Sequence, residues 1–264
     1  MKIHINIIPG KLTILYFYDI ILTHRKRVAI YFKERRGKMN KESLTSLSFI
    51  IELLNPPMKH QNINIHKLFL EFKDIYTNCI KVTDTITELS RINKDNQEIN
   101  KLMIQNNKIV VMNNFTTNTI ESFWKRASYV IEKTVLCLNI PLFFFRQYTL
   151  RFTASPLKEK DSRVFLGNVV CSLNDNNLKP FNRPIHGIGL RIVLPPLPNE
   201  QNEYNIRIES LLSEMGKIFL ENQARFLAPL QLQGKYLDNI KAEIDKTDKF
   251  LKDNVCDFLE QYNK

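Results

Sequence analysis

The chain has 264 residues, 44% of them hydrophobic and 25% charged, which is enough to bury a core without a disulfide or a metal and excludes an intrinsically disordered chain. The formal net charge is +11, but residues 1–38 hold nine Lys or Arg residues against two acidic ones, which leaves +4 for the remainder. The body of the chain is therefore nearly balanced, and its composition does not by itself indicate nucleic-acid binding.

Residues 1–38 differ from the rest of the chain. Their apolar run, residues 12–22, is too short to cross a bilayer, and no small-residue cleavage site follows it, so neither a transmembrane helix nor a signal peptide is predicted. The codons of Arg35-Arg36-Gly37 can form a ribosome-binding string just before Met39. We prefer the interpretation that residues 1–38 are an untranslated leader over a genuine extension, which could act as an interfacial membrane anchor.

The first half of the chain alternates between strand-like and helix-like patterns. Residues 47–54 alternate apolar side chains before Pro56-Pro57, which predicts a strand, and residues 65–75 have the apolar spacing of an amphipathic helix. Shorter strands are expected at residues 80–89 and 108–112. The most regular helix is predicted at residues 119–138, with Asn118 or Thr119 as its N-cap.

The second half begins with an expected strand at residues 143–153, followed by a short helix and loops over residues 156–180. The run Phe143-Phe144-Phe145 is interpreted as core packing in preference to base stacking. Strands are predicted at residues 188–194, 204–210 and 217–222, the last two joined through Met215-Gly216. The chain closes with a long amphipathic helix at about residues 235–260, whose apolar side must pack on another element.

These elements predict an α+β fold, in which a mostly antiparallel sheet is packed by a central amphipathic helix (about 119–138) and a long C-terminal helix (about 235–260). The sequence shows no repeating strand-helix-strand order, no internal repeat and no low-complexity linker. We therefore expect residues 39–264 to form a single α+β domain, with a candidate sub-boundary near residues 139–156.

Motifs for catalysis, metal binding or phosphate binding do not stand out. The cysteines, Cys79, Cys137, Cys171 and Cys256, form no CxxC pair and have no histidine at ligand spacing, so we expect reduced thiols buried among apolar neighbours in a cytoplasmic protein. The close glycines of Gly187-Ile188-Gly189 lead into a strand, which favours a tight strand start over a phosphate loop. No catalytic residue, metal ligand or cofactor is assigned.

Isolated carboxylates give only a background expectation of a metal-dependent nuclease. Asp161, Glu209 and Glu221 are far apart in the sequence, and a metal centre would require the fold to bring them together.

Three expected strands each place an arginine between large apolar residues, namely Arg151, Arg191 and Arg207. Because side chains alternate along a strand, the apolar neighbours should face the core and the three arginines should point to the opposite face. With Glu209, which is placed to pair with Arg207, they form a candidate row for binding phosphate or carboxylate. The alternative, which is the commoner situation, is a solvated face on which arginine stems cover apolar area.

The aromatic-rich helix at residues 119–138, the strand ending in Tyr148-Thr149-Leu150-Arg151-Phe152, and the C-terminal strand pair followed by a helix resemble a sporadically distributed prokaryotic family of uncharacterised proteins. The resemblance covers about residues 45–260 and includes no diagnostic motif. It implies an α+β fold and a prokaryotic origin, and it assigns no site residue.

We expect a non-enzymatic cytoplasmic protein whose sheet and terminal helix bind a protein partner or an anionic ligand, or mediate self-association. Nucleic-acid binding or processing is the alternative, motivated by the arginine row and the residual basic charge. Membrane attachment is not expected unless residues 1–38 are a genuine part of the protein.

Overall fold

The computed structural model describes residues 44–83, 85–93, 95, 97–155 and 160–262. The interpretations of residues 1–38 lie outside the described residues and stay predictions. Within the described part of the chain, no helix is both long enough and apolar enough to cross a membrane.

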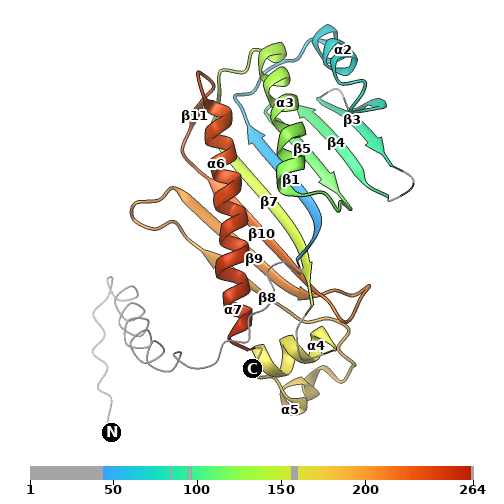
Figure 1. Cartoon of the computed structure of the whole chain (residues 1–264), viewed down its shortest axis with the longest axis vertical. Helices are drawn as coiled ribbons and strands as arrows, with labels where there is room; N and C mark the ends of the chain where they lie inside the picture. Colours follow the sequence, from blue (N-terminus) through green and yellow to red (C-terminus); the bar gives the residue numbers. More distant parts are fainter. Residues whose placement is uncertain (1–43, 84, 94, 96, 156–159, 263–264) are drawn as a thin grey trace. The chain divides into compact units, whose positions relative to one another are not determined.

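A nine-stranded antiparallel sheet, in the order β2-β3-β4-β5-β1-β7-β10-β9-β8, runs through the described residues (Figure 1). The first half of the chain contributes β1 (Thr45–Leu54), β2 (Asn78–Thr83), β3 (Ile86–Ile92), β4 (Ile99–Gln105) and β5 (Lys108–Asn114). The second half contributes β7 (Phe145–Ala154), β8 (Gly189–Leu194), β9 (Asn202–Ser210) and β10 (Ile218–Phe226). A small separate sheet pairs β6 (Leu142–Phe143) with β11 (Leu230–Gln231).

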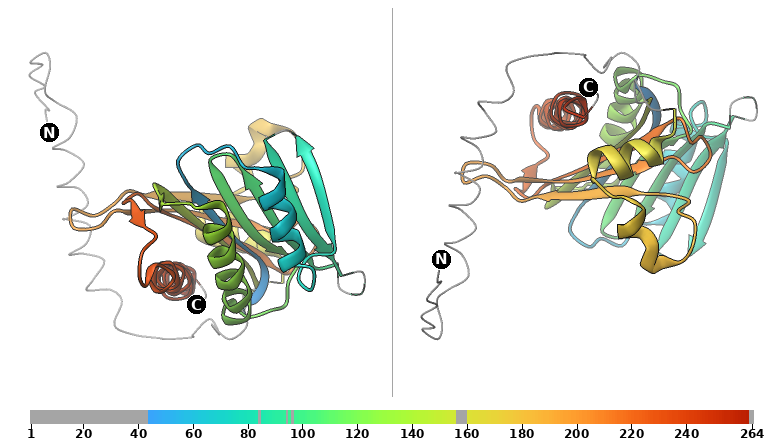
Figure 2. Two further views of the ribbon diagram at one scale, coloured as in Figure 1. Left: turned by 90° about the horizontal axis from the view of Figure 1, so that it is seen from above. Right: turned by 90° about the horizontal axis from the view of Figure 1, so that it is seen from below.

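The long helices lie on one face of this sheet, as the end-on views in Figure 2 show. They are α2 (Asn62–Glu71), α3 (Ile120–Leu138) and α6 (Tyr236–Lys249), which continues through the π-helical η4 (Phe250–Val255) into α7 (Cys256–Glu260). Short helical turns follow β7 at one end of the sheet: α4 (Ser162–Val164), η2 (Phe165–Val170), α5 (Asp175–Leu178) and η3 (Lys179–Phe181). The predicted α+β class, central helix and C-terminal helix are confirmed.

The core lies between the sheet and the long helices. Alternate residues of the two middle strands point into it, with Phe49 and Ile51 from β1 and Tyr148 and Leu150 from β7 all buried. Phe123 of α3 contacts Phe49, with 5.4 Å between the ring centroids. Period-two and period-3.6 apolar patterns therefore meet in one core, as the sequence predicts.

A buried ion pair joins α6 to the middle of the sheet. Arg146 of β7 faces the helices and forms a two-point contact with Glu243 of α6, through Nε to Oε2 at 2.8 Å and Nη2 to Oε1 at 2.6 Å. The Tyr148 hydroxyl donates to Glu243 Oε2 at 2.7 Å, and the Arg146 Nη1 donates to the Ala228 carbonyl. Burial, followed by the nearby Glu243 charge, raises the pKa of Tyr148, so this hydroxyl keeps its proton.

Several sequence predictions differ from the structure in detail. The single strand expected at residues 80–89 is a hairpin, β2 and β3, and β4 was not predicted at all. The residues expected to be buried include Cys79, which is exposed on the edge strand β2, and Phe144, which is half-exposed. The range 139–156 contains β7, which pairs with β1 on one side and β10 on the other.

The sheet has a two-fold arrangement that is invisible in the sequence. Each half of the chain begins with a middle strand and passes through a helical segment, which is α2 in the first half and α4 to η3 in the second (Figure 1). It then returns as a meander that ends beside that middle strand, and it finishes with a helix, α3 or α6. The halves match as β1 with β7, β5 with β10, β4 with β9, β3 with β8, and α3 with α6. Among the described residues, the outermost strand β2 has no counterpart, so the second half of the sheet contains one strand fewer than the first.

Candidate functional site

The open face is the name used here for the sheet surface opposite α3 and α6 (Figure 2). It carries the alternate side chains of each strand, so that Gln147, Thr149 and Arg151 of β7 point to it while Tyr148 and Leu150 point to the core. The same alternation on the neighbouring strands brings polar side chains together over most of this surface.

The three arginines singled out from the sequence all point to the open face. Arg151 lies on β7, Arg207 on β9 and Arg191 on β8, each between neighbours that face the core. Strands β8 and β9 are adjacent, and Arg191 is directly opposite Arg207. Strand β10 separates β9 from β7, so Arg151 does not lie on an adjacent strand.

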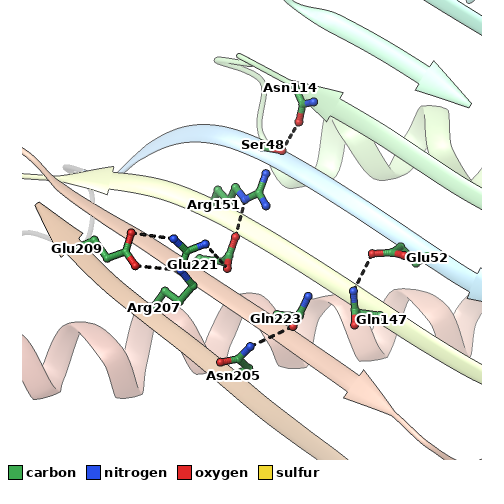
Figure 3. Close-up of polar contacts among 10 residues, drawn as sticks. All are labelled: Ser48, Glu52, Asn114, Gln147, Arg151, Asn205, Arg207, Glu209, Glu221 and Gln223. Atoms are coloured by element: carbon green, nitrogen blue, oxygen red, sulfur yellow. Dashed lines mark hydrogen bonds and ion pairs between the residues drawn. The ribbon is translucent and has the colours of Figure 1, made fainter. Parts of the chain in front are cut away.

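Carboxylates already contact two of these guanidinium groups (Figure 3). Arg151 Nε donates to Glu221 Oε2 at 2.6 Å, and Arg207 Nη1 lies 3.4 Å from the other oxygen of Glu221. Arg207 Nη2 also lies 2.8 Å from Glu209 Oε2, which is the pairing that the sequence suggested. The hydrogen bonds with Glu209 raise the pKa of Arg207, so this cation is held in its charged form. Any anion bound here would have to compete with Glu221.

A continuous row of polar contacts crosses five strands of the open face. Lys108 Nζ of β5 lies 3.2 Å from Glu52 Oε2 of β1, whose other oxygen accepts from Gln147 Nε2 at 2.7 Å. The Gln147 oxygen accepts from Arg225 Nε of β10 at 2.9 Å, and Arg225 Nη1 lies 2.9 Å from Glu203 Oε1 of β9. Each polar side chain in this row therefore has a partner on an adjacent strand.

Further contacts extend this network towards both edges of the sheet. Asn205 of β9 donates to Gln223 of β10 at 3.1 Å and accepts from Arg191 Nε of β8 at 2.9 Å. On the other half, Lys101 of β4 lies 2.9 Å from Glu88 of β3. We call this whole set of cross-strand ion pairs and hydrogen bonds the polar network.

The charges of the open face almost cancel. Its basic residues are Lys101, Lys108, Arg151, Arg191, Arg207 and Arg225, and its acidic residues are Glu52, Glu88, Glu203, Glu209 and Glu221. Within the part of the chain that the structure describes, all of them except Arg191 form an ion pair with another residue of this face. Glu221 is only 4% exposed. Arg151 and Arg207 both contact its carboxylate, and these long side chains shield it from water.

The sequence predicted the face of the three arginines but missed most of their partners. In the sequence Glu221 stands as an isolated acid, and no local pattern links it, Glu52, Gln147 or Arg225 to the three arginines. The alternation along β10 does indicate which residues share the face with these arginines, namely Phe219, Glu221, Gln223 and Arg225. The strand predicted from the sequence ends at residue 222, so it includes only the first two of them.

Other candidate sites in the described residues are less developed. No cluster of three or more His, Cys, Asp or Glu side chains able to hold a metal occurs there. Asp161 pairs with Arg163, whereas Glu209 and Glu221 both pair with Arg207. On the core side, Glu98 accepts hydrogen bonds from Asn113 and Asn118, a contact set that ties β5 to the start of α3.

No protein-family description matches the sequence, and no curated protein is significantly similar to it. The site is therefore interpreted from its own geometry.

Proposed function

We propose that this is a non-enzymatic binding or assembly protein whose open face docks a partner protein. The observation that carries the proposal is the polar network, which holds long charged side chains in fixed places across five strands. Immobilising such side chains during association costs about 0.5–1.5 kcal/mol each, and here folding has already ordered them. A rigid surface with alternating charges suits a protein partner of complementary pattern.

The same network argues against a polyanionic partner. Nucleic-acid binding draws its affinity from basic groups that release counterions on meeting phosphates. On the open face the basic groups already contact carboxylates, and Arg151 and Arg207 share Glu221. A phosphate would gain little at such a site, so a protein partner is preferred over an anionic ligand and over nucleic acid.

Site-specific photo-crosslinking tests the proposal. A photoreactive amino acid replaces Ile50, which is half-buried on the open face, or Leu136, which is exposed on α3. We expect a discrete covalent adduct in cells from position 50 and none of that mass from position 136. In the double variant Glu203→Arg/Arg225→Glu, one ion pair is retained with its polarity reversed, and the adduct should disappear without loss of folding. An adduct that survives this reversal would count against the open face as the docking surface.

Retention on heparin distinguishes the nucleic-acid alternative. Both the full chain and a form starting at Met39 are compared, because the N-terminal residues carry most of the excess charge. We expect the shorter form to elute at low salt. Tight retention of that form, falling steeply with salt, would instead support phosphate binding by the sheet.

A further inference from the structure

The outer edge of β8 is the place where the two-fold arrangement is incomplete. In the first half of the sheet, β3 is covered on its outer side by β2, whereas β8, the counterpart of β3, ends the sheet. The position that a tenth strand would occupy is therefore vacant in the described part of the chain (Figure 1).

The backbone of β8 presents free hydrogen-bonding groups at this edge. Ser210 N donates to the Ile188 carbonyl at 2.9 Å, which fixes the alternation of the antiparallel ladder that follows. Even-numbered residues of β8 thus bond to β9, while the N–H and C=O groups of Gly189, Arg191 and Val193 point away from it. No hydrogen bond within the described residues reaches these outward groups, and all three residues are exposed.

Side chains of β8 indicate what an added strand would carry. On the open face, Arg191 donates to the Asn205 amide oxygen. Among the described residues it is the one basic member of the polar network without a carboxylate partner, so a tenth strand could supply the missing acid. On the other side, Leu190, Ile192 and Leu194 are half-buried and pack against the core, so an added strand would place apolar side chains beside them.

The opposite edge of the sheet is protected differently. Strand β2 carries Lys81 and has a register shift between Lys81 and Thr83, two features that discourage edge-to-edge pairing. Strand β8 pairs with β9 in an unbroken register from Gly189 to Leu194. The regular ladder leaves the outer edge of β8 continuous over these six residues, and Pro195 and Pro196, which follow it directly, limit the added strand to its length.

We propose that β8 binds an extended segment of a partner protein as an antiparallel tenth strand. The segment alternates apolar residues, which lie beside Leu190 and Ile192, with polar ones, and it places one carboxylate opposite Arg191. This edge site shares Arg191 with the open face, but its backbone groups belong to the edge of β8 alone. Peptide binding at the edge and crosslinking from position 50 therefore test different surfaces, and each can fail without the other. Hydrogen bonds to the backbone groups of Arg191 and Val193 provide the affinity, and the ion pair between Arg191 and the carboxylate determines the register of the added strand against β8.

Two synthetic peptides test this proposal on the full chain. Both alternate Val with Thr and carry fluorescein; one has Glu at a central polar position and the other has Lys there. We expect the Glu peptide to bind the wild-type protein at least tenfold more tightly than the Lys peptide, by fluorescence anisotropy. The variant Arg191→Glu should reverse that preference, whereas Lys125→Glu, the same charge change on an exposed residue of α3, should leave it unchanged.

A backbone variant isolates the hydrogen bonds. The variant Val193→Pro removes an N–H that points outward and keeps the hydrogen bonds between β8 and β9. Both peptides should therefore lose binding, while the circular dichroism spectrum of the protein stays unchanged. If this variant fails to fold, the charge reversal at Arg191 decides alone. Equal binding of both peptides to every variant, or no binding at all, overturns the proposal. A dimer that Val193→Pro converts to a monomer would also overturn it, because a second copy would then occupy the edge.

Discussion

At the scale of single residues, Glu243 is the side chain whose loss should be felt most strongly. It neutralises Arg146, whose side chain is only 4% exposed, and accepts the Tyr148 hydroxyl. Glu243→Ala leaves a buried guanidinium without its counter-charge, and breaking a buried pair in this way costs about 3–5 kcal/mol. We expect a loss of that size in the free energy of unfolding, measured by urea denaturation.

The matched control for this change lies two residues away on the same helix. Lys241 forms an ion pair with Asp245 one helical turn later, at the solvent side of α6. Because exposed pairs contribute only about 0–1 kcal/mol, Lys241→Ala should shift the unfolding midpoint very little. A comparable loss in both variants would show that the helix, and not the buried pair, is responsible.

Asp161 gives a pH prediction at the same scale. Hydrogen bonds from the Arg163 side chain lower the pKa of Asp161 from 3.8 to about 2. The folded state therefore prefers the carboxylate, and this contribution to stability is present above pH 4 and lost as the pH falls through about 2. A carbon-detected NMR titration should give a midpoint near 2 for this carboxyl. Arg163→Gln should raise the midpoint towards 3.8, and an unchanged midpoint would contradict the assignment.

At the scale of elements, the start of α3 depends on one hydroxyl. Thr119 Oγ1 accepts from the Ser122 N–H at 3.2 Å, which satisfies one of the free donors of the first turn. Thr119→Ala should therefore lower the free energy of unfolding by about 1 kcal/mol in chemical denaturation. Thr117→Ala removes the same group from an exposed position outside the helix and should change stability by less than about 0.5 kcal/mol.

At the scale of the whole molecule, the two halves should not fold apart. Strands β1 and β7 pair along their full lengths, from Thr45 with Thr153 to Leu54 with Phe145, and separation would expose both as long edges. We expect fragments 39–139 and 140–264 to be insoluble alone and to form a native-like complex when co-expressed, judged by gel filtration and circular dichroism. A soluble, monomeric fragment with a cooperative melt would show instead that a domain boundary lies near residue 139.

The central and C-terminal helices could be predicted closely because an apolar stripe repeated over many turns fixes both extent and orientation, whereas the shorter helix expected at residues 65–75 is α2, Asn62–Glu71. The helix expected at residues 119–138 is α3, Ile120–Leu138. Strand β4 escaped prediction because Asn100 occupies a core-facing position, where its amide bonds to Asn113 of β5, so the period-two pattern is broken. A polar residue satisfied by a distant strand cannot be recognised from local sequence.

The candidate site, too, could be predicted only in part from the sequence. Alternation along each strand correctly predicts that Arg151, Arg191 and Arg207 share a face, because it is a property of one strand. Their pairing with Glu221 depends on which strands are adjacent and in what register, and no local pattern contains that information. The vacant edge beside β8 could not be predicted from the sequence either, because the repeat that reveals it is present in the order of the strands and not in the residues.

The pairing of β1 with β7 also bears on how the chain is made. While the ribosome extends the chain, β1 can find β5 early, but its other neighbour is complete only when Ala154 has emerged. During that interval the nascent chain holds a nearly complete half-sheet in which one side of β1 is an unpaired edge beside exposed apolar residues. Such long-range closure slows folding and invites aggregation, so the nascent chain has reason to need a chaperone during the middle of its synthesis.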